Sequence, residues 1–247
     1  MIEPMPKLAT RAEPPRQRWL AVFSLLRELP SIAVHAVYLA PATYGLLLII
    51  VITTAIQLRL DPDAAQAIVR NRSVNLTNLA TLQFRVLFAS ILWLQDEWLV
   101  PQLIMWAAFF VFVLARVEHW LGTWTWIAIF VAAHLATVLI TVVRLYVLIH
   151  AFHTGYQYQS IVDVGVSYGA LALGGMFAHR LPPKRRALFL GILVVAVGVA
   201  AFLGSAFSVG PHLTALALGL ALVPAARRWG PPALRLRVGP PGLPSLA

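Results

Sequence analysis

Long apolar runs separated by short polar segments make up most of the chain. Each run holds few charged residues, and several contain windows of more than about 18 apolar residues, the pattern of membrane-spanning helices. The runs cover about residues 32–56, 98–115, 124–149, 161–179, 187–207 and 211–225. The pattern predicts an all-α polytopic membrane protein with six transmembrane helices.

The segment between the first two runs is less regular. Residues 57–80 are polar with charges of both signs, which predicts a loop, and residues 81–94 are semi-apolar. Arg85 interrupts the semi-apolar piece, and residues 95–97 end it with polar side chains. We therefore expect this piece to be re-entrant or to lie at the membrane surface, with a short seventh helix as the alternative.

Composition agrees with a membrane protein, because 60% of the 247 residues are hydrophobic and only 11% are charged. A soluble domain carries roughly a quarter charged residues. The chain has no cysteine, which excludes disulfides, thiolate metal sites and a cysteine nucleophile. The formal net charge of +10 does not predict nucleic-acid binding, since the basic residues lie between or beyond the apolar runs.

The distribution of Lys and Arg predicts the orientation. They concentrate in both tails and in the turn at 180–186, whereas the connections at 150–160 and 205–210 carry none. The positive-inside rule then places both termini in the cytoplasm. The alanine- and arginine-rich composition indicates a bacterial cytoplasmic membrane. The chain is expected to divide into a flexible cytoplasmic tail, a membrane domain and a disordered basic tail, at residues 1–30, 31–226 and 227–247.

Small residues predict close packing between the fourth and sixth runs. Gly165 and Gly169 form a small-xxx-small pair in the fourth run, which lets another helix backbone approach. The sixth run places His212, Ala215 and Gly219 on one stripe. We expect these two helices to touch through their glycine and alanine faces.

Such a contact would bring Ser167 close to His212 in the outer half of the membrane. A serine hydroxyl becomes nucleophilic when a base takes its proton, and histidine can be that base. The alternative is that Ser167 bonds back to its own helix while His212 marks a membrane interface. Asp163 lies four residues before Ser167, on the same face of a helix, and is expected either to cap that helix or to orient His212 or Tyr168. Arg144 either pairs with Asp163 or snorkels outward.

The chain resembles the rhomboid intramembrane serine proteases, and in particular divergent rhomboid-like membrane proteins of actinobacteria. The resemblance covers about residues 80–220 and continues into the segment that precedes them. It rests on Gly165-Val166-Ser167, on His212-Leu-Thr-Ala-Leu-Ala-Leu-Gly219, on the acidic-then-glycine turn Val117–Gly122, on Gln83–Phe88, on Ser73–Leu79 and on Asp163–Gly169. It implies a six-helix rhomboid-like bundle with a membrane-embedded first loop.

By this resemblance Ser167 is the nucleophile and His212 its base, and the protein cleaves transmembrane proteins near the outer membrane face. The activity needs no metal and no other cofactor. Gln102, Gly165, Tyr168 and Asp163 are the expected oxyanion and supporting residues. The partners implied are a transmembrane substrate or client and the lipid bilayer, with no nucleic acid.

The chain also departs from the family pattern. Tyr168 follows the serine where the family has glycine, and Leu171 stands where the family has a tyrosine. Gln102 and Trp106 occupy the places of the family's His-x-x-x-Asn pair. These departures leave a second hypothesis open, a catalytically inactive rhomboid-like pseudoprotease that binds transmembrane segments. A small transporter is disfavoured, because no paired charges follow a pathway and no half-and-half symmetry is visible.

Overall fold

The computed structural model describes residues 34–81, 85–95, 98–203 and 206–239. The chain divides into two compact units, Met1–Leu39 and Ala40–Ala247. In the first unit the described residues 34–39 are helical. The expected N-terminal tail, the expected start of the first span at residue 32 and the last eight residues lie outside the described residues.

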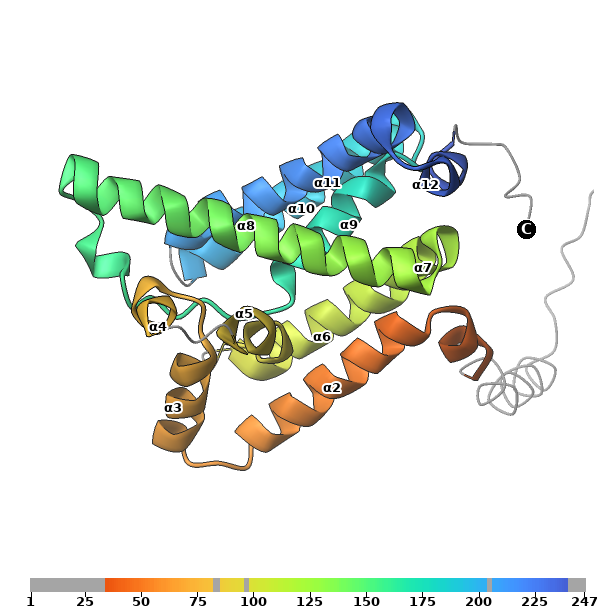
Figure 1. Ribbon diagram of the computed structural model, residues 1–247. Helices are drawn as coiled ribbons and strands as arrows, with labels where there is room; N and C mark the ends of the chain where they lie inside the picture. Colours follow the sequence, from red (N-terminus) through yellow and green to blue (C-terminus); the bar gives the residue numbers. More distant parts are fainter. Residues whose placement is uncertain (1–33, 82–84, 96–97, 204–205, 240–247) are drawn as a thin grey trace, which may run out of the picture. The chain divides into compact units, whose positions relative to one another are not determined.

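All the regular secondary structure in the described residues of the second unit is helical, with no strand among them (Figure 1). Its α-helices are α2 (Pro41–Gln57), α3 (Pro62–Arg72), α4 (Leu76–Ala80), α5 (Arg85–Ala89), α6 (Leu99–Phe109), α7 (Ala115–Leu121), α8 (Thr123–Phe152), α9 (Ser167–Ala178), α10 (Pro183–Leu203), α11 (Val209–Trp229) and α12 (Pro232–Arg237). Short 3₁₀ turns are η1 (Ser90–Leu92), η4 (Tyr156–Tyr158) and η5 (Ala206–Ser208), and η3 (Phe110–Leu114) is a π-helix.

Three helical stretches of the described chain are long and apolar enough to cross a membrane. They are Leu99–Leu121, Thr123–Phe152 and Val209–Trp229, while α2 and α9 are apolar but shorter. The all-α class and the integral membrane character are therefore supported. The count of six spans and the orientation of the termini stay predictions.

The expected polar loop at residues 57–80 contains two helices, α3 and α4. Asp61 caps α3 by accepting a hydrogen bond from the Ala64 N–H (2.9 Å), and Asn75 caps α4 in the same way. The semi-apolar piece forms two short elements, α5 and η1, instead of one seventh helix. Val86 and Leu94 of this piece are fully buried, so it packs into the bundle.

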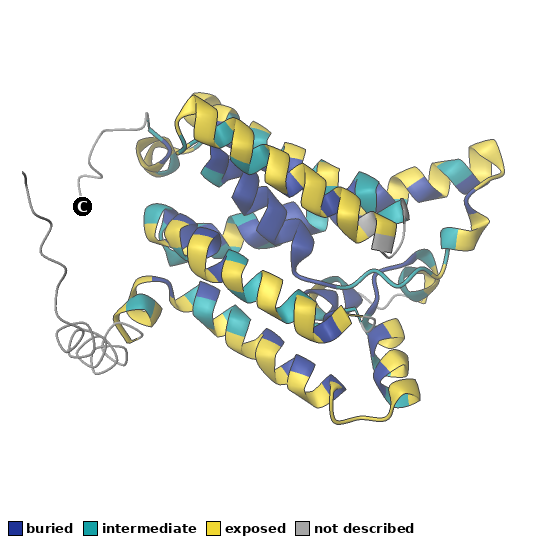
Figure 2. Ribbon diagram, turned by 180° about the vertical axis from the view of Figure 1, so that it is seen from behind, coloured by how far each residue is buried: buried dark blue, intermediate teal, exposed yellow. Residues whose placement is uncertain are grey.

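Helix α9 begins at Ser167, six residues later than expected, so Asp163 does not share a helical face with Ser167. Gly165 has φ +130°, a conformation that favours glycine and interrupts a helix. Its N–H donates to the Ser90 carbonyl (2.8 Å), which ties this extended segment to η1. From Ser167 to Met176 every residue of α9 is buried, and Figure 2 shows it as the dark blue helix inside the bundle.

The C-terminal segment is helical up to Arg237, although the sequence predicted a disordered tail from residue 227; the division of the chain into tails and membrane domain stays a prediction. Helix α11 continues to Trp229, and α12 follows after one short connection. The Val238 side chain is fully buried, and the Arg227 Nε–H donates to the Val238 carbonyl (2.6 Å). Apolar burial therefore holds a stretch that its arginines and prolines had marked as disordered.

Glu118 of α7 supplies hydrogen-bond acceptors to α2 and to the start of α8. Its buried carboxylate accepts hydrogen bonds from the Ala42 N–H (3.0 Å), the Thr43 N–H (2.7 Å) and the Thr123 hydroxyl (2.8 Å). The two N–H groups belong to the first turn of α2, where helical donors have no partner within the helix. Glu118 thus caps α2 from a distant part of the chain and joins it to the α7–α8 turn.

Candidate functional site

Helices α9 and α11 pack closely enough to place backbone against backbone. A Cβ added at Gly219 would lie 1.9 Å from the Ala172 carbonyl oxygen, and one at Gly175 would lie 2.6 Å from the Leu216 carbonyl oxygen. The two helices run parallel, since the Tyr168 ring meets His212 near their starts and His179 Nε2 bonds the Leu220 carbonyl (2.9 Å) further along. Both helices therefore begin at the same end of the bundle.

Two of the four expected packing residues have other neighbours. Gly165 lies before the helix, and Gly169 faces α8, where an added Cβ would lie 2.6 Å from the Phe130 ring. Gly219 does contact α9, and Ala215 is fully buried in α11. On α9 the close contact with α11 is therefore made by Gly175 and not by Gly165 or Gly169. Gly175 stands in a Gly-Gly pair but was not among the predicted packing residues.

A cavity of about 910 Å³ opens between α6, α10 and the starts of α9 and α11. Its lining is mainly apolar: Met105 and Trp106 come from α6, and Leu188, Ile192 and Val195 come from α10. The polar residues that line it include Gln102, Asp163, Ser167, Ser208 and His212. Ser167 and His212 therefore face one shared space.

Ser167 is the first residue of α9 and is 8% exposed. No hydrogen bond of its Oγ is found among the described residues, so it does not bond back to its own helix as the alternative required. No side chain caps the first turn of α9. The first N–H groups of a helix have no partner within it and carry a partial positive charge. The hydroxyl thus stands where a developing negative charge is favoured.

His212 is held by its own helix and by Tyr168. Its Nδ1 lies 2.6 Å from the Ser208 carbonyl oxygen, and the Tyr168 ring meets it edge-on with centroids 5.2 Å apart. A carbonyl only accepts, so Nδ1 carries the proton of the neutral ring and Nε2 keeps the free lone pair. Within the described chain no hydrogen bond joins His212 to Ser167.

Asp163 binds Tyr168 instead of capping α9. The Tyr168 hydroxyl donates to both carboxylate oxygens, at 2.9 and 2.8 Å, and the Asp163 N–H donates to Ser73 Oγ (2.6 Å). Burial raises the pKa of the Asp163 carboxyl to about 6, against the opposing effect of the Tyr168 hydrogen bond. Arg144 does not pair with Asp163; its guanidinium lies against Gly210 of α11.

The expected oxyanion support from α6 is only partly available. The Gln102 side-chain amide donates to the Gln95 carbonyl (3.2 Å), so this donor is engaged with the preceding loop. Trp106 packs edge-on against Phe109, with ring centroids 5.9 Å apart. Both side chains line the cavity. Among the described residues, no three His, Cys, Asp or Glu side chains come together as metal ligands would.

Two further contacts position the site without a signal in the sequence pattern. The Ser208 carbonyl, which selects the His212 tautomer, is a backbone atom that any residue would supply. Ser73 reaches across to the segment before α9, where its Oγ donates to the Ile161 carbonyl (3.1 Å). The Ser73–Leu79 resemblance pointed to this stretch but not to its role.

Comparison with known proteins gives one match. Residues 35–231 match the family model described as rhomboid-like protein, which covers more than half of the chain. No curated protein and no solved structure matches the chain at the significance required.

Proposed function

The chain belongs to the rhomboid-like family, and from that premise we propose that it is an intramembrane serine peptidase that cleaves transmembrane substrates. Ser167 is the nucleophile and His212 the general base. The observation that carries the proposal is the single cavity in which both side chains end, with the Ser167 hydroxyl at a helix N-terminus and the His212 Nε2 lone pair unprotonated.

The chemistry follows from these atoms. Ser167 Oγ attacks the scissile carbonyl carbon while His212 Nε2 takes its proton, and the uncapped N–H groups at the start of α9 stabilise the oxyanion. The imidazolium then protonates the leaving amine as the C–N bond breaks, which leaves an acyl ester on Ser167. Water, deprotonated by His212, hydrolyses that ester and restores the hydroxyl.

The Ser167–His212 hydrogen bond has to form when substrate binds. Catalytic hydrogen bonds are often loose in the free enzyme and tighten in the complex. The apolar walls of the cavity favour a substrate that is itself apolar, since burying its side chains against Ile192, Val195 and Met105 removes hydrocarbon surface. A transmembrane segment supplies such side chains.

A second function, binding without cleavage, is supported by a different set of observations. Gln102 already donates to a backbone carbonyl, and the bulky Trp106 stands at the second of the expected oxyanion positions. The Tyr168 hydroxyl donates to Asp163 and is therefore not free to bind a substrate. In this alternative the cavity holds a transmembrane client and Ser167 and His212 are inert.

Labelling with a fluorophosphonate separates the two functions. The purified protein in detergent should react with the probe, and Ser167→Ala should abolish labelling. His212→Ala should slow it by at least about a hundredfold, because the general base is lost.

The matched control is Ser208→Ala, which removes another hydroxyl in the same cavity but keeps the carbonyl that orients His212. This variant should label like the parent. A folded parent that does not react, or a Ser167→Ala variant that reacts as fast as the parent, would overturn the peptidase proposal and favour the binder.

A further inference from the structure

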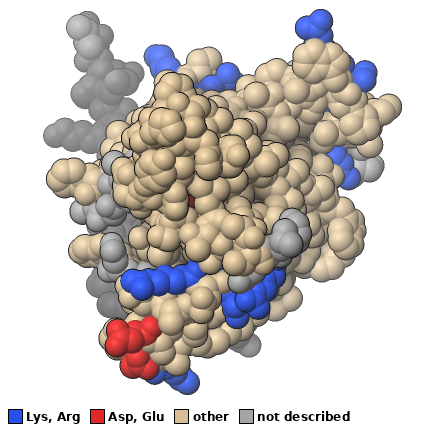
Figure 3. Space-filling model, turned by 60° about the vertical axis from the view of Figure 1, so that its left-hand side comes forward, with Lys and Arg blue, Asp and Glu red and all other residues tan. Residues whose placement is uncertain are grey.

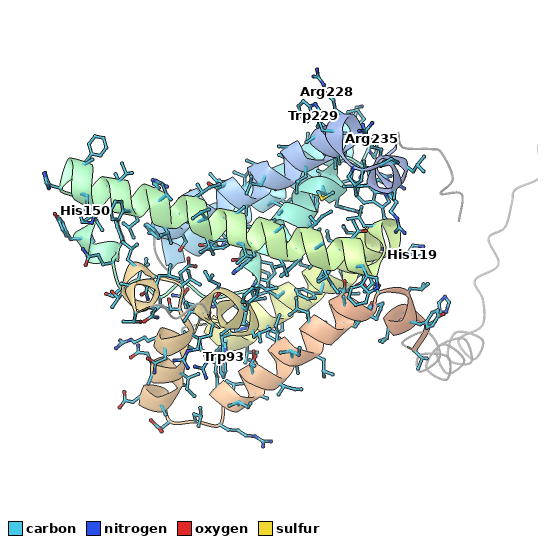
Figure 4. All side chains as sticks on the ribbon, in the orientation of Figure 1. Trp93, His119, His150, Arg228, Trp229 and Arg235 are labelled. Atoms are coloured by element: carbon cyan, nitrogen blue, oxygen red, sulfur yellow. The ribbon has the colours of Figure 1, made fainter. Side chains whose placement is uncertain are left out.

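Basic side chains gather at the end of the bundle where α9 and α11 finish. We call this the basic end; its members are Arg116, Arg180, Lys184, Arg185, Arg227, Arg228, Arg235 and Arg237. Arg228 and Arg235 lie at this end on either side of Trp229 (Figure 4). The only described carboxylate here is Glu118, which is buried and holds three donors. The exposed Asp61 and Asp63 lie in and beside α3, at the far end of α2 (Figures 1 and 3).

Some arginines of the basic end donate side-chain hydrogen bonds to the protein, and others do not. The side chains of Arg227, Arg235 and Arg237 each donate to backbone carbonyls and so hold α12 in place. The guanidinium groups of Arg180 and Arg228 make no hydrogen bond to any described residue, although the Arg180 backbone N–H donates to the Phe177 carbonyl (2.8 Å). Each instead lies over a tryptophan ring, which orients the guanidinium and leaves its N–H donors open.

Trp120 connects Arg180 to α12, whereas Arg228 lies over its sequence neighbour Trp229. The Arg180 guanidinium lies 5.1 Å from the centroid of Trp120, whose indole N–H donates to the Arg237 carbonyl. The Arg228 guanidinium lies 5.0 Å from the centroid of Trp229. Three segments far apart in sequence, the α7 helix, the α9–α10 turn and α12, therefore converge on one surface.

Exposed apolar side chains border the open cations. Trp229 is 71% exposed, Leu236 of α12 is 84% exposed, and Leu188 of α10 is 66% exposed. Leu188 follows Lys184 by four residues and so shares its helix face. A water-soluble polyanion would satisfy the charges but leave this hydrocarbon in water. The surface of an anionic bilayer satisfies both, because phosphates and acyl chains lie next to each other in depth.

We infer that the basic end binds the headgroups of anionic phospholipids, with α12 lying in the membrane interface. Arg180 and Arg228 bind the phosphodiester oxygens, Lys184 and Arg185 add to the local positive field, and Trp229 and Leu236 enter the acyl boundary. This inference does not depend on catalysis, so it stands or falls separately from the peptidase proposal.

The test uses the full chain, purified in a neutral detergent and titrated with short-chain phosphatidylglycerol or phosphatidylcholine. Native mass spectrometry counts the lipids retained, and thermal unfolding reports the stabilisation. Phosphatidylglycerol should bind at least about tenfold more tightly than phosphatidylcholine, since a basic residue near an anionic surface contributes about fivefold in affinity. The double variant Arg180→Gln/Arg228→Gln should lose most of this preference.

The control is Arg59→Gln/Arg70→Gln, which removes two exposed cations near α3 and should keep the preference. Lys184→Gln/Arg185→Gln is a second test variant, used if the first unfolds below the parent's temperature without lipid. Equal preference in the test and control variants would overturn the inference. Competition by inorganic phosphate or by an oligonucleotide at the same concentration as the lipid would also overturn the inference. The site would then bind a soluble anion or a nucleic acid.

Discussion

Gly219 is the position at which the α9–α11 contact is least able to absorb an added atom. In Gly219→Ala the new Cβ would lie 1.9 Å from the Ala172 carbonyl oxygen, whereas carbon and oxygen approach to about 3.3 Å in ordinary close contacts. The clashing atoms are backbone, so no rotamer change relieves them. The two helices must separate by more than about 1 Å.

That separation carries a measurable cost. Overpacking in a well-packed core costs about 1–3 kcal/mol when side chains can shift, so a backbone clash places Gly219→Ala at about 3 kcal/mol or more. For a chain of this size the Tm should fall by about 6–12 °C. The fluorophosphonate reaction should slow as well, because α11 carries His212 and α9 carries Ser167.

The matched control is Gly198→Ala in α10, where an added Cβ meets nothing within 4 Å. Alanine is favoured over glycine inside a helix by up to about 1 kcal/mol, so this variant should unfold at or above the parent's temperature. The assay is heat unfolding in detergent followed by tryptophan fluorescence. The reasoning fails if both variants shift the Tm in the same direction by similar amounts.

Two further predictions concern the carboxylates of Glu118 and Asp163. Glu118→Ala leaves the Ala42 and Thr43 N–H groups and the Thr123 hydroxyl without their acceptor. It should lower the free energy of unfolding by about 3 kcal/mol or more, measured by denaturation in detergent. An unchanged unfolding midpoint would show that water replaces the carboxylate. The raised pKa of Asp163, about 6 against 3.8, means that its contribution to stability is complete below pH 4 and is lost as the pH rises through 6. The Tm of Asp163→Asn minus that of the parent should therefore increase between pH 4.5 and 7.5, and a flat difference would refute the shift.

The long helices could be predicted closely because their signal is local. The run expected at residues 124–149 is α8, Thr123–Phe152, and the run expected at 211–225 is α11, Val209–Trp229. Apolar length alone sets such elements, since a helix satisfies its own backbone hydrogen bonds in a membrane. The start of α9 was missed by six residues because Gly165 and its bond to Ser90 interrupt a run that is mostly apolar.

The candidate site, too, was predictable where the signal lies in residue type and spacing, and not where it depends on contacts between distant segments. Ser167 and His212 were candidates from residue type, spacing and family resemblance, and the structure places both on one cavity. The role of Asp163 was open, and the contact with Tyr168 decides between capping and bonding. Gln102 keeps its place beside the cavity, but its bond to Gln95 could not be foreseen from the order of the residues.

By itself, the sequence determined the helical membrane class, the approximate bounds of the long helices and the residue types available for chemistry. Only the tertiary structure decided which glycines bring helices together, where α9 begins, which His212 nitrogen is open and how α12 returns to the bundle. The physical reason is that hydrophobic periodicity is a property of neighbouring residues. Backbone carbonyls such as those of Ser208, Ser90 and Ala172 become partners only when distant segments meet, and they carry no side-chain signature.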